Sequence, residues 1–327
     1  YGGVNTWVEL SNKLFMPLLF VLFILFVIQA LRLPGAVQGL NAFFTPNWSA
    51  MMNYKVWLAA YGHTFFSLSV GFGIMVTYAS YLKPKTNLTG SGLIVGFANA
   101  STEILAGIGI FAALGFMAYA ANTNVEDVVS GGIGLAFIAF PKIISSLGAG
   151  ADLFGILFFT SLFVAGISSM VSILEVPISA MMDKLKWSRK KAVSIIGGGS
   201  ALVSIVLFSS VNSIKLVDII DHFINNIGII GGALLSIISI AWFKRSALIE
   251  IRNHVNAIST VQLGKGWDFT LTVITSLILL ITLGMTIYNL LLKGYGDYSL
   301  SLQWLFGWGC VMFCAVVAFI LSRVKDR

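Results

Sequence analysis

Charged residues are scarce in this chain of 327 residues and make up only 10% of it. A soluble domain of this length carries roughly 25% charged residues, which cover its water-facing surface. Hydrophobic residues reach 57%, and the mean hydropathy is +0.92. The chain therefore lacks the polar surface of a soluble protein, and we expect lipid to solvate most of it.

Strict alternation of apolar and polar residues is also missing, and this excludes a membrane β-barrel. Only closed barrels and helices span lipid, because every backbone polar group there needs an internal partner. The apolar runs are instead long and continuous, which is typical of membrane helices. The sequence predicts an all-α membrane protein.

Cysteine and catalytic groups are few. Cys310 and Cys314 lie four residues apart in one apolar run, with no His or carboxylate near them, so we interpret them as small packing residues rather than a metal pair. No Ser-His-Asp or metal-ligating constellation stands out in the sequence, and we predict that the protein is not an enzyme. We interpret the net charge of +7 as a consequence of Lys and Arg in cytoplasmic loops, rather than as a sign of nucleic-acid binding.

Eight apolar segments come near the roughly 20 residues that cross a bilayer. They lie at about 12–31, 56–81, 91–120, 151–182, 190–210, 214–243, 268–292 and 301–322. The segment 122–150 is too glycine-rich and interrupted for a span, and it is predicted to be a long structured loop with Pro141 after a short apolar run.

Lysine and arginine set the predicted orientation, because they accumulate in cytoplasmic loops. With a cytoplasmic N-terminus and alternating spans, the inner segments hold 15 of the 20 basic residues. The outer segments hold the other five, which are Arg32, Lys55, Lys142, Lys215 and Lys293. We therefore expect a multi-pass protein of the plasma membrane with both termini of this chain in the cytoplasm.

Small and polar residues interrupt the second segment, 56–81, at mid-bilayer depth. Ser67, Ser69, Gly71 and Gly73 break an otherwise apolar run. Glycine weakens a helix and exposes its backbone, and this is tolerated in the membrane only against protein or a water-filled cavity. Discontinuous helices of this kind surround substrates and ions in secondary transporters. A tight helix crossing through small residues is the alternative.

The fourth segment carries Ala165, Ser168 and Ser169, which share one helix face at positions i, i+3 and i+4. One carbonyl and two hydroxyls could converge there, and oxygen ligands suit a hard cation such as sodium. Serines inside a membrane more often bond back to their own helix or to a neighbouring one. These residues alone favour packing, with sodium binding as the alternative.

Carboxylates mark further candidate positions. Glu103 lies four residues beyond Asn99 on one helix face, and a carboxylate inside a span is costly enough to be a functional candidate by default. The alternative is a protonated Glu that is bonded within the bundle. Asp221 has a similar status, whereas Asp183 fits a solvated helix end. The basic run 184–191 is interpreted as a cytoplasmic loop rather than a ligand site.

Several stretches, taken together, resemble the neurotransmitter:sodium symporter family, especially its bacterial leucine-transporter-like members. They are VWLAAYGHTFFSLSVGFGIMVTYASY (56–81), FANASTEILAG (97–107), AGISSMVSILE (165–175), DKLKWSRKKAV (183–193), DHFINNIG (221–228) and the segments 16–36 and 264–268. The resemblance implies the leucine-transporter-type inverted-repeat fold of twelve helices. Residues 1–327 then form one transmembrane transporter domain that corresponds to the fifth to twelfth helices, with the N-terminal four missing.

The resemblance also assigns roles to single residues. The substrate-binding positions are Phe66, Ser67, Ser69, Phe72, Ser169 and Ile173. The ligands of a first sodium ion are Ser67 and Asn99, and those of a second are the Ala165 carbonyl, Ser168 and Ser169. Asp221 matches an outer gate, the loop 122–150 matches an extracellular lid, and Ser80, Tyr81 and Asp183 match an inner gate.

Five positions depart from the family pattern or distinguish its members. Ser67 and Ser168 stand where the leucine transporter has threonine, and Glu175 and His63 replace neutral amides. Glu103 occupies a position where chloride-dependent members carry a neutral residue. The resemblance therefore implies that Glu103 substitutes for a bound anion and that no chloride is required.

The function implied by the resemblance is sodium-coupled import of neutral, hydrophobic amino acids by alternating access, with two sodium ions. The expected partners are the amino acid, sodium and the lipid bilayer, with no nucleic acid, and a homodimer is left open. The alternatives are another transporter of this architecture, a non-transporting amino-acid-binding membrane protein, or an inactive truncated fragment. The start at Tyr1, without Met, suggests a fragment.

Overall fold

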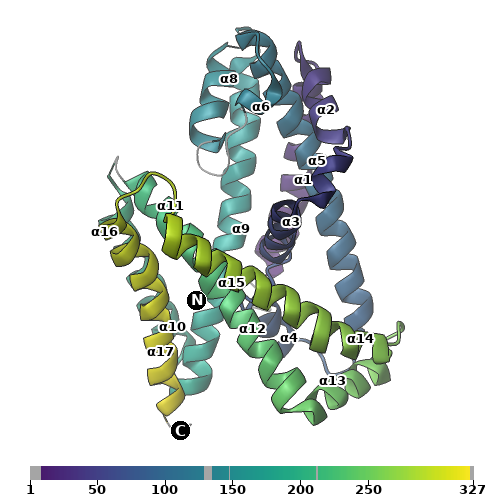
Figure 1. The fold of residues 1–327 in the computed structure, drawn as a ribbon, viewed down its shortest axis with the longest axis vertical. Helices are drawn as coiled ribbons and strands as arrows, with labels where there is room; N and C mark the ends of the chain where they lie inside the picture. The colour runs from purple at the N-terminus through teal and green to yellow at the C-terminus, as the bar shows by residue number, and fades with distance from the viewer. Residues whose placement is uncertain (1–8, 129–134, 147, 211–212, 325–327) are drawn as a thin grey trace. The chain divides into compact units, whose positions relative to one another are not determined.

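A computed structural model describes residues 9–128, 135–146, 148–210 and 213–324. Within these ranges the chain is helical and has no β-strand (Figure 1). The α-helices are α1 (Glu9–Leu31), α2 (Ala36–Phe44), α3 (Tyr54–Ser67), α4 (Ile74–Ser80), α5 (Leu88–Ala121), α6 (Val125–Val128), α8 (Phe140–Ser146), α9 (Ala151–Leu185), α10 (Arg189–Phe208), α11 (Ser213–Phe223), α12 (Ile230–Ile238), α13 (Arg245–Ile258), α14 (Lys265–Phe269), α15 (Ser276–Lys293), α16 (Leu300–Leu302) and α17 (Gly309–Arg323).

Short turns of other helix types join some of these elements. They are the 3-10 turn η2 (Trp48–Met52) and the π-helical turns η3 (Leu135–Ala139), η4 (Ile224–Ile229), η5 (Ser239–Phe243), η6 (Thr270–Thr275) and η7 (Gln303–Trp308). Four of the π-helical turns, η4 to η7, continue a helix without a break, so that α11 to η5, α14 to α15 and α16 to α17 each form one long rod.

Seven of the described helical rods are long and apolar enough to cross a membrane. They are Lys13–Leu31, Leu88–Ala121, Ala151–Leu185, Arg189–Phe208, Ser213–Phe243, Lys265–Lys293 and Leu300–Arg323. The remaining predicted segment, 56–81, which is the second along the chain, is divided into α3 and α4. The prediction of an all-α, multi-pass membrane protein is therefore confirmed.

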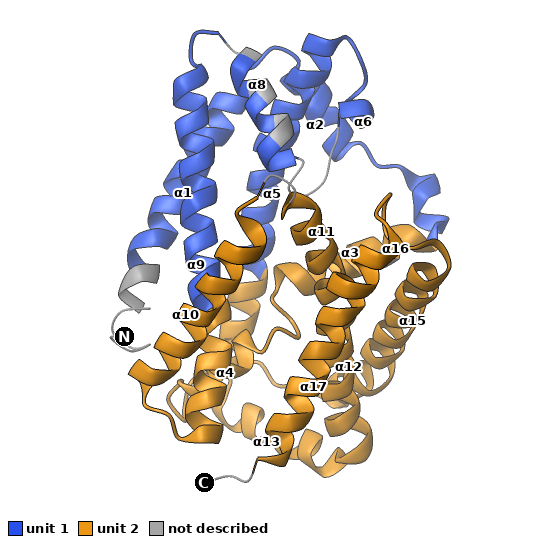
Figure 2. Ribbon diagram, turned by 90° about the vertical axis from the view of Figure 1, so that its left-hand side faces the viewer, with its two compact units in different colours: residues 1–53, 97–172 blue, residues 54–96, 173–327 orange. Residues whose placement is uncertain are grey.

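The chain divides into two compact units, which are coloured separately in Figure 2. Unit 1 consists of residues 1–53 and 97–172, and unit 2 consists of residues 54–96 and 173–327. The boundaries at 96/97 and 172/173 fall inside α5 and α9, so each of these helices contributes to both units. Each unit is described by itself.

Aromatic side chains form the core of unit 1. Phe26 of α1 packs against Phe140, Phe154 and Phe158, with ring centroids 5.2 to 6.1 Å apart. The rings of Phe140 and Phe158 stack at 3.9 Å. These contacts join α1 to α8 and α9, and buried alanines of α5 complete the cluster.

Glycines let α2 approach α5 in unit 1. A Cβ atom on Gly39 would lie 1.7 Å from the carbonyl oxygen of Phe111, and one on Gly115 would lie 2.4 Å from that of Gly35. Small residues at helix interfaces let backbones come this close in membrane proteins. The α2–α5 contact therefore requires glycine at these positions.

Replacing Gly39 by alanine is expected to destabilise the protein, because the new methyl group overlaps backbone that cannot rotate away. Overpacking of this kind costs about 1–3 kcal/mol. Gly92→Ala is the matched control, since nothing lies within 4 Å of a Cβ there and alanine favours a helix. Melting temperatures in detergent should fall for Gly39→Ala and hold or rise for Gly92→Ala, and equal values would contradict the tight contact.

Unit 2 has its core between α11, η4, α12 and α15. Ile219 and Phe223 of α11 are fully buried and pack with Ile227 and Leu290. A second cluster joins α12 to Leu279 of α15 and to the partly buried Phe65 of α3. This packing places α3 beside α12 and α15, where the candidate site begins.

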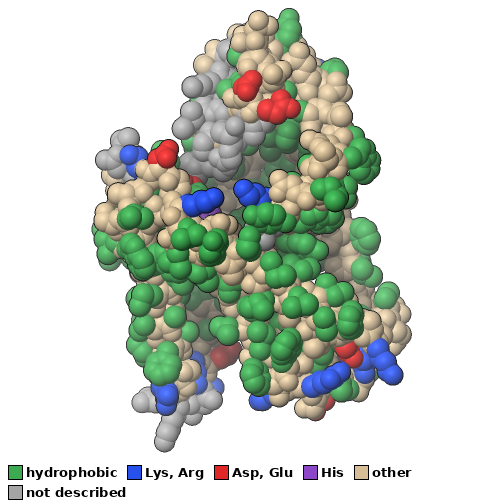
Figure 3. Space-filling model, viewed as in Figure 1, with side chains coloured by type: hydrophobic (Ala, Val, Ile, Leu, Met, Phe, Trp, Pro, Cys, Tyr) green, Lys and Arg blue, Asp and Glu red, His purple; other side chains and the backbone are tan. Residues whose placement is uncertain are grey.

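The surface agrees with a lipid environment. Figure 3 shows hydrophobic side chains over much of the visible face, with lysine and arginine gathered near α13 and α14. Many large apolar side chains of the long helices are exposed, which in water would be unusual for a monomer.

The predicted loop 122–150 contains the short helices α6, η3 and α8 in its described part. Pro141 is the second residue of α8, which continues directly from the π-helical turn η3. Residues 129–134 and 147 lie outside the described ranges. The described part of this predicted loop is structured and largely helical, and its role as a lid stays a prediction.

Candidate functional site

The interruption of the second span lies between Ser67, where α3 ends, and Ile74, where α4 begins. The N–H of Val70 donates to the Phe65 carbonyl at 2.9 Å, and that of Ser69 donates to the Phe66 carbonyl at 3.0 Å. This pair of bonds is the Schellman arrangement that closes a helix with a left-handed residue. Here that residue is Ser69, with φ 52, although glycine is usual at this position.

Two glycines carry the chain from this turn into α4. Gly71 and Gly73 have φ 81 and 79, values that L side chains rarely adopt. A Cβ on Gly71 would also lie 3.0 Å from the carbonyl oxygen of Ile229. The predicted break in the helix is thus confirmed, and the residues that suggested it are those that form it.

Two aromatic side chains meet at the break, Phe66 from the last turn of α3 and Phe72 from the break itself. The rings of Phe66 and Phe72 meet edge to face, with centroids 5.8 Å apart. Phe66 is 57% exposed, and Ile173 at the start of the unit 2 portion of α9 is 50% exposed. Unit 2 therefore brings two of the predicted substrate-binding side chains together and presents apolar surface around Ser67 and Ser69.

Asn99 and Glu103 of α5 are joined in unit 1. The amide Nδ2 of Asn99 donates to Oε1 of Glu103 at 2.9 Å, and both side chains are partly buried. The shared helix face predicted from their spacing is confirmed. This bond fixes the orientation of the Asn99 amide, and its use as a sodium ligand stays a prediction.

The serines of α9 are positioned by their own helix. Ser168 is 8% exposed, and its hydroxyl donates to the Ala165 carbonyl at 2.9 Å. This is the packing arrangement that the sequence alone favours. It also holds two of the predicted sodium-ligand oxygens next to each other. Ser169, one residue on, is exposed.

The predicted ligands of the first sodium ion and the predicted substrate positions are divided between the two units, whereas the predicted ligands of the second ion all belong to unit 1. Ser67, Phe66 and Phe72 belong to unit 2, whereas Asn99 and Ser168 belong to unit 1. The structure therefore describes the two portions of the predicted site separately. Their use as a single site stays a prediction.

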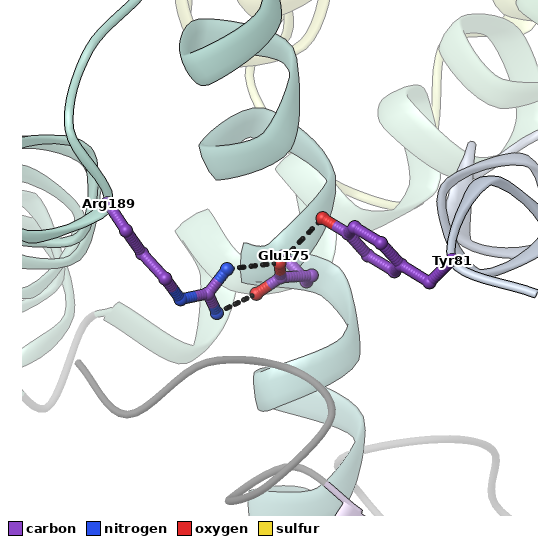
Figure 4. A network of polar contacts seen from close by, with 3 residues as sticks. All are labelled: Tyr81, Glu175 and Arg189. Atoms are coloured by element: carbon purple, nitrogen blue, oxygen red, sulfur yellow. Dashed lines mark hydrogen bonds and ion pairs between the residues drawn. The ribbon is translucent and has the colours of Figure 1, made fainter.

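A buried ion pair lies on α9 two residues after the predicted substrate position Ile173 (Figure 4). Glu175 is only 3% exposed and receives two hydrogen bonds from Arg189, at 2.8 and 2.7 Å. The hydroxyl of Tyr81 donates to the same carboxylate at 3.1 Å. Ser188 caps α10 by accepting the Lys191 N–H at 3.4 Å, which fixes Arg189 as the first residue of that helix.

This network joins three elements of unit 2, namely the end of α4, α9 and the start of α10. Of the predicted inner-gate residues, it contains Tyr81 only. The Ser80 hydroxyl donates to the Thr77 carbonyl of its own helix at 2.6 Å, and Asp183 is exposed. Sequence reasoning missed the role of Arg189, because it assigned the run 184–191 to a loop. The signal was Glu175, a carboxylate in an apolar span without an assigned partner.

Two acidic residues of α11, Asp218 and Asp221, accept hydrogen bonds from neighbouring side chains. Asp221 accepts a hydrogen bond from Asn225 at 2.8 Å. Asp218 accepts one from each hydroxyl of Tyr295 and Tyr298, at 3.1 and 2.8 Å. Burial raises the pKa of Tyr295, and the hydrogen bond to Asp218 raises that of Tyr298. Both phenols therefore stay protonated donors at neutral pH.

Comparison with known proteins gives one family over nearly the whole chain. The family model described as the Sodium:neurotransmitter symporter family matches residues 4–325. An uncharacterized sodium-dependent transporter of Methanocaldococcus jannaschii is 40% identical over 324 residues, which are 99% of this chain and 65% of that protein.

Two animal relatives are more distant. A sodium-dependent nutrient amino acid transporter 1 of Drosophila grimshawi is 33% identical over 65% of this chain and 34% of its own length. A sodium- and chloride-dependent glycine transporter 2 of Xenopus laevis is 26% identical over 91% of this chain and 38% of its own length. The chain thus spans less than two thirds of each of these relatives.

Proposed function

We propose, starting from the fact that the chain belongs to the sodium:neurotransmitter symporter family, that the whole protein is a sodium-coupled symporter that imports neutral, hydrophobic amino acids by alternating access. The observation that carries the proposal is the discontinuous helix α3–α4, with Phe66 of α3 in contact with Phe72 inside its break. Half-helix ends inside a membrane surround substrates and ions in secondary transporters.

Sodium coupling is supported by the kind of oxygen atoms that the predicted ligands offer. The Ala165 carbonyl and the Ser168 hydroxyl oxygens lie 2.9 Å apart, and Asn99 offers an amide oxygen while its NH₂ group bonds Glu103. Such neutral oxygens suit a hard monovalent cation. We propose two sodium ions, one of which also contacts the substrate, so that each ligand raises the affinity for the other.

The substrate class is inferred from the side chains near the break. Phe66, Phe72 and Ile173 are apolar, so a charged substrate side chain would be desolvated there without a partner. The nutrient amino acid transporter among the relatives is consistent with amino acids as the substrate class. Neutral, apolar amino acids are therefore the proposed cargo.

The test uses the whole protein in proteoliposomes. Leucine uptake should require an inward sodium gradient, and unlabelled leucine or tryptophan should inhibit it more than lysine or glutamate. Ser168→Ala should raise the sodium concentration for half-maximal uptake at least tenfold, because it removes a proposed ligand. Ser101→Ala is the control, since that serine makes the same kind of bond to its own helix, at 2.8 Å to Phe97.

The outcomes separate the proposal from its rivals. Leucine binding without gradient-driven uptake would indicate a non-transporting amino-acid-binding protein. Stronger inhibition by lysine or glutamate would overturn the substrate class. If Ser168→Ala and Ser101→Ala showed the same sodium dependence as the unmodified protein, Ser168 would have only the packing role.

A further inference from the structure

A polar cavity of about 460 Å³ lies within unit 2, apart from the break in the second span. Its wall comes from α3, from α11 with η4, and from α15 with the turn that follows it, all of which belong to the orange unit of Figure 2. The side chains with polar groups in the wall are Lys55, His63, His222, Asn226, Thr282, Thr286, Asn289 and Tyr295.

Each helix gives one stripe of residues to this cavity. On α15, Thr282, Thr286 and Asn289 follow one another at i, i+4 and i+7 in a helix that is otherwise almost wholly apolar. Thr282 is only 5% exposed. Polar residues on one face of a membrane helix are expected to face protein or water rather than lipid. The stripe is therefore accounted for by a polar cavity.

The other two helical rods around the cavity contribute one lysine, two histidines and one asparagine. Lys55 and His63 lie eight residues apart on the same face of α3. His222 and Asn226 lie four apart on the rod that begins with α11. Hydrogen-bond donors thus converge on the cavity from three helices.

One part of the wall is held rigidly. The ring of His222 stacks on that of Tyr295 with centroids 3.7 Å apart. Nδ2 of Asn226 donates to the His222 carbonyl at 2.9 Å, and Gln303 binds both the N–H and the carbonyl of Tyr295, at 2.8 and 3.2 Å. A wall fixed in this way loses little entropy when a ligand binds.

The charge of the lining points to a ligand of the opposite sign. Lys55 brings a positive charge, and no Asp or Glu is among the lining residues. Asp218, one turn before His222 on α11, accepts hydrogen bonds from both Tyr295 and Tyr298. The volume exceeds what a monatomic anion needs and lies in the usual range for small organic ligands. Ala59, Leu290 and the Tyr295 ring offer apolar surface for the rest of the molecule.

We propose that this cavity binds a small organic carboxylate, with Lys55 contacting the carboxylate group and the polar stripe of α15 completing its hydrogen bonds. The site is distinct from the proposed substrate positions, and its test measures binding without transport. It can therefore fail while the proposed symport holds, and the converse is equally possible.

The probe is 4-fluorophenylacetate, followed by fluorine NMR line broadening with the whole protein in lipid nanodiscs and with empty nanodiscs subtracted. The neutral 4-fluorophenylacetamide has the same shape without the charge. Lys55→Met should weaken binding of the carboxylate at least fivefold, and Lys55→Arg should restore most of it. Lys215→Met is the matched control, since Lys215 is an exposed lysine of α11 that does not line the cavity, and it should change binding less than twofold.

Three results would overturn the proposal. The amide could bind as tightly as the carboxylate, which would show that charge is not recognised. Lys55→Met could match Lys215→Met, which would place the probe elsewhere. Chloride at 0.1 M could displace the probe fully, which would show a simple anion site instead of one for an organic carboxylate.

Discussion

Arg189→Ala is expected to lower the free energy of unfolding by about 3–5 kcal/mol, the usual cost of removing one partner of a buried ion pair. The cause is Glu175, which is 3% exposed and would keep only the hydrogen bond from Tyr81. A carboxylate left in this position has lost two charge-assisted hydrogen bonds. Thermal unfolding in detergent, followed by intrinsic fluorescence, measures the loss.

Two variants show whether the loss comes from the unpaired carboxylate. Lys190→Ala removes an exposed charge from the next position of the same helix and should change stability by less than about 0.5 kcal/mol. The double variant Glu175→Gln with Arg189→Gln removes both charges and should recover much of the stability lost in Arg189→Ala. A double variant as unstable as the single one would mean that the two residues do not act as a pair.

Chloride dependence is the second large effect, and it rests on the proposed function. With Glu103 replaced by serine, uptake without chloride should fall at least tenfold and return when chloride is added. Two sodium ions and a zwitterion bring excess positive charge into a low-dielectric region, which a nearby negative charge offsets. Glu103 supplies that charge next to Asn99, a proposed sodium ligand 2.9 Å away. The unmodified protein should be indifferent to chloride.

The measurement is uptake with gluconate in place of chloride. Glu126→Ser is the control, because Glu126 is an exposed carboxylate of the short helix α6, which also belongs to unit 1. This variant should leave uptake indifferent to chloride. The role of Glu103 would be excluded if the unmodified protein required chloride. The glycine transporter among the relatives is named as sodium- and chloride-dependent. A Glu103→Ser variant fully active without chloride would make Glu103 structural.

The spans and the break were readable from the sequence because each depends on local chemistry. A membrane helix needs a run of apolar residues, and the interruption needs residues that tolerate a positive φ, which Gly71 and Gly73 provide. The proximity of Asn99 and Glu103 could be predicted for the same reason, since helical spacing puts both on one face.

The ion pair and the polar cavity could not be read in this way. Glu175 and Arg189 are 14 residues apart, and a loop intervenes between their helices, so no periodicity relates them. The cavity joins α3 to α15, which are more than 200 residues apart in the chain at Lys55 and Thr282. Only the packing of unit 2 shows that their polar stripes face one another.

Two of the three places where the chain passes from one unit to the other lie inside continuous helices, α5 and α9. Close to these crossings, side-chain hydroxyls bond to carbonyls of their own helix, at 2.8 Å from Thr102 to Ala98 and at 3.2 Å from Ser172 to Ser168. Bonds of this type bend helices and weaken them slightly. At these two crossings any bend would therefore have to deform a helix, whereas a loop would rotate about its single bonds at little cost.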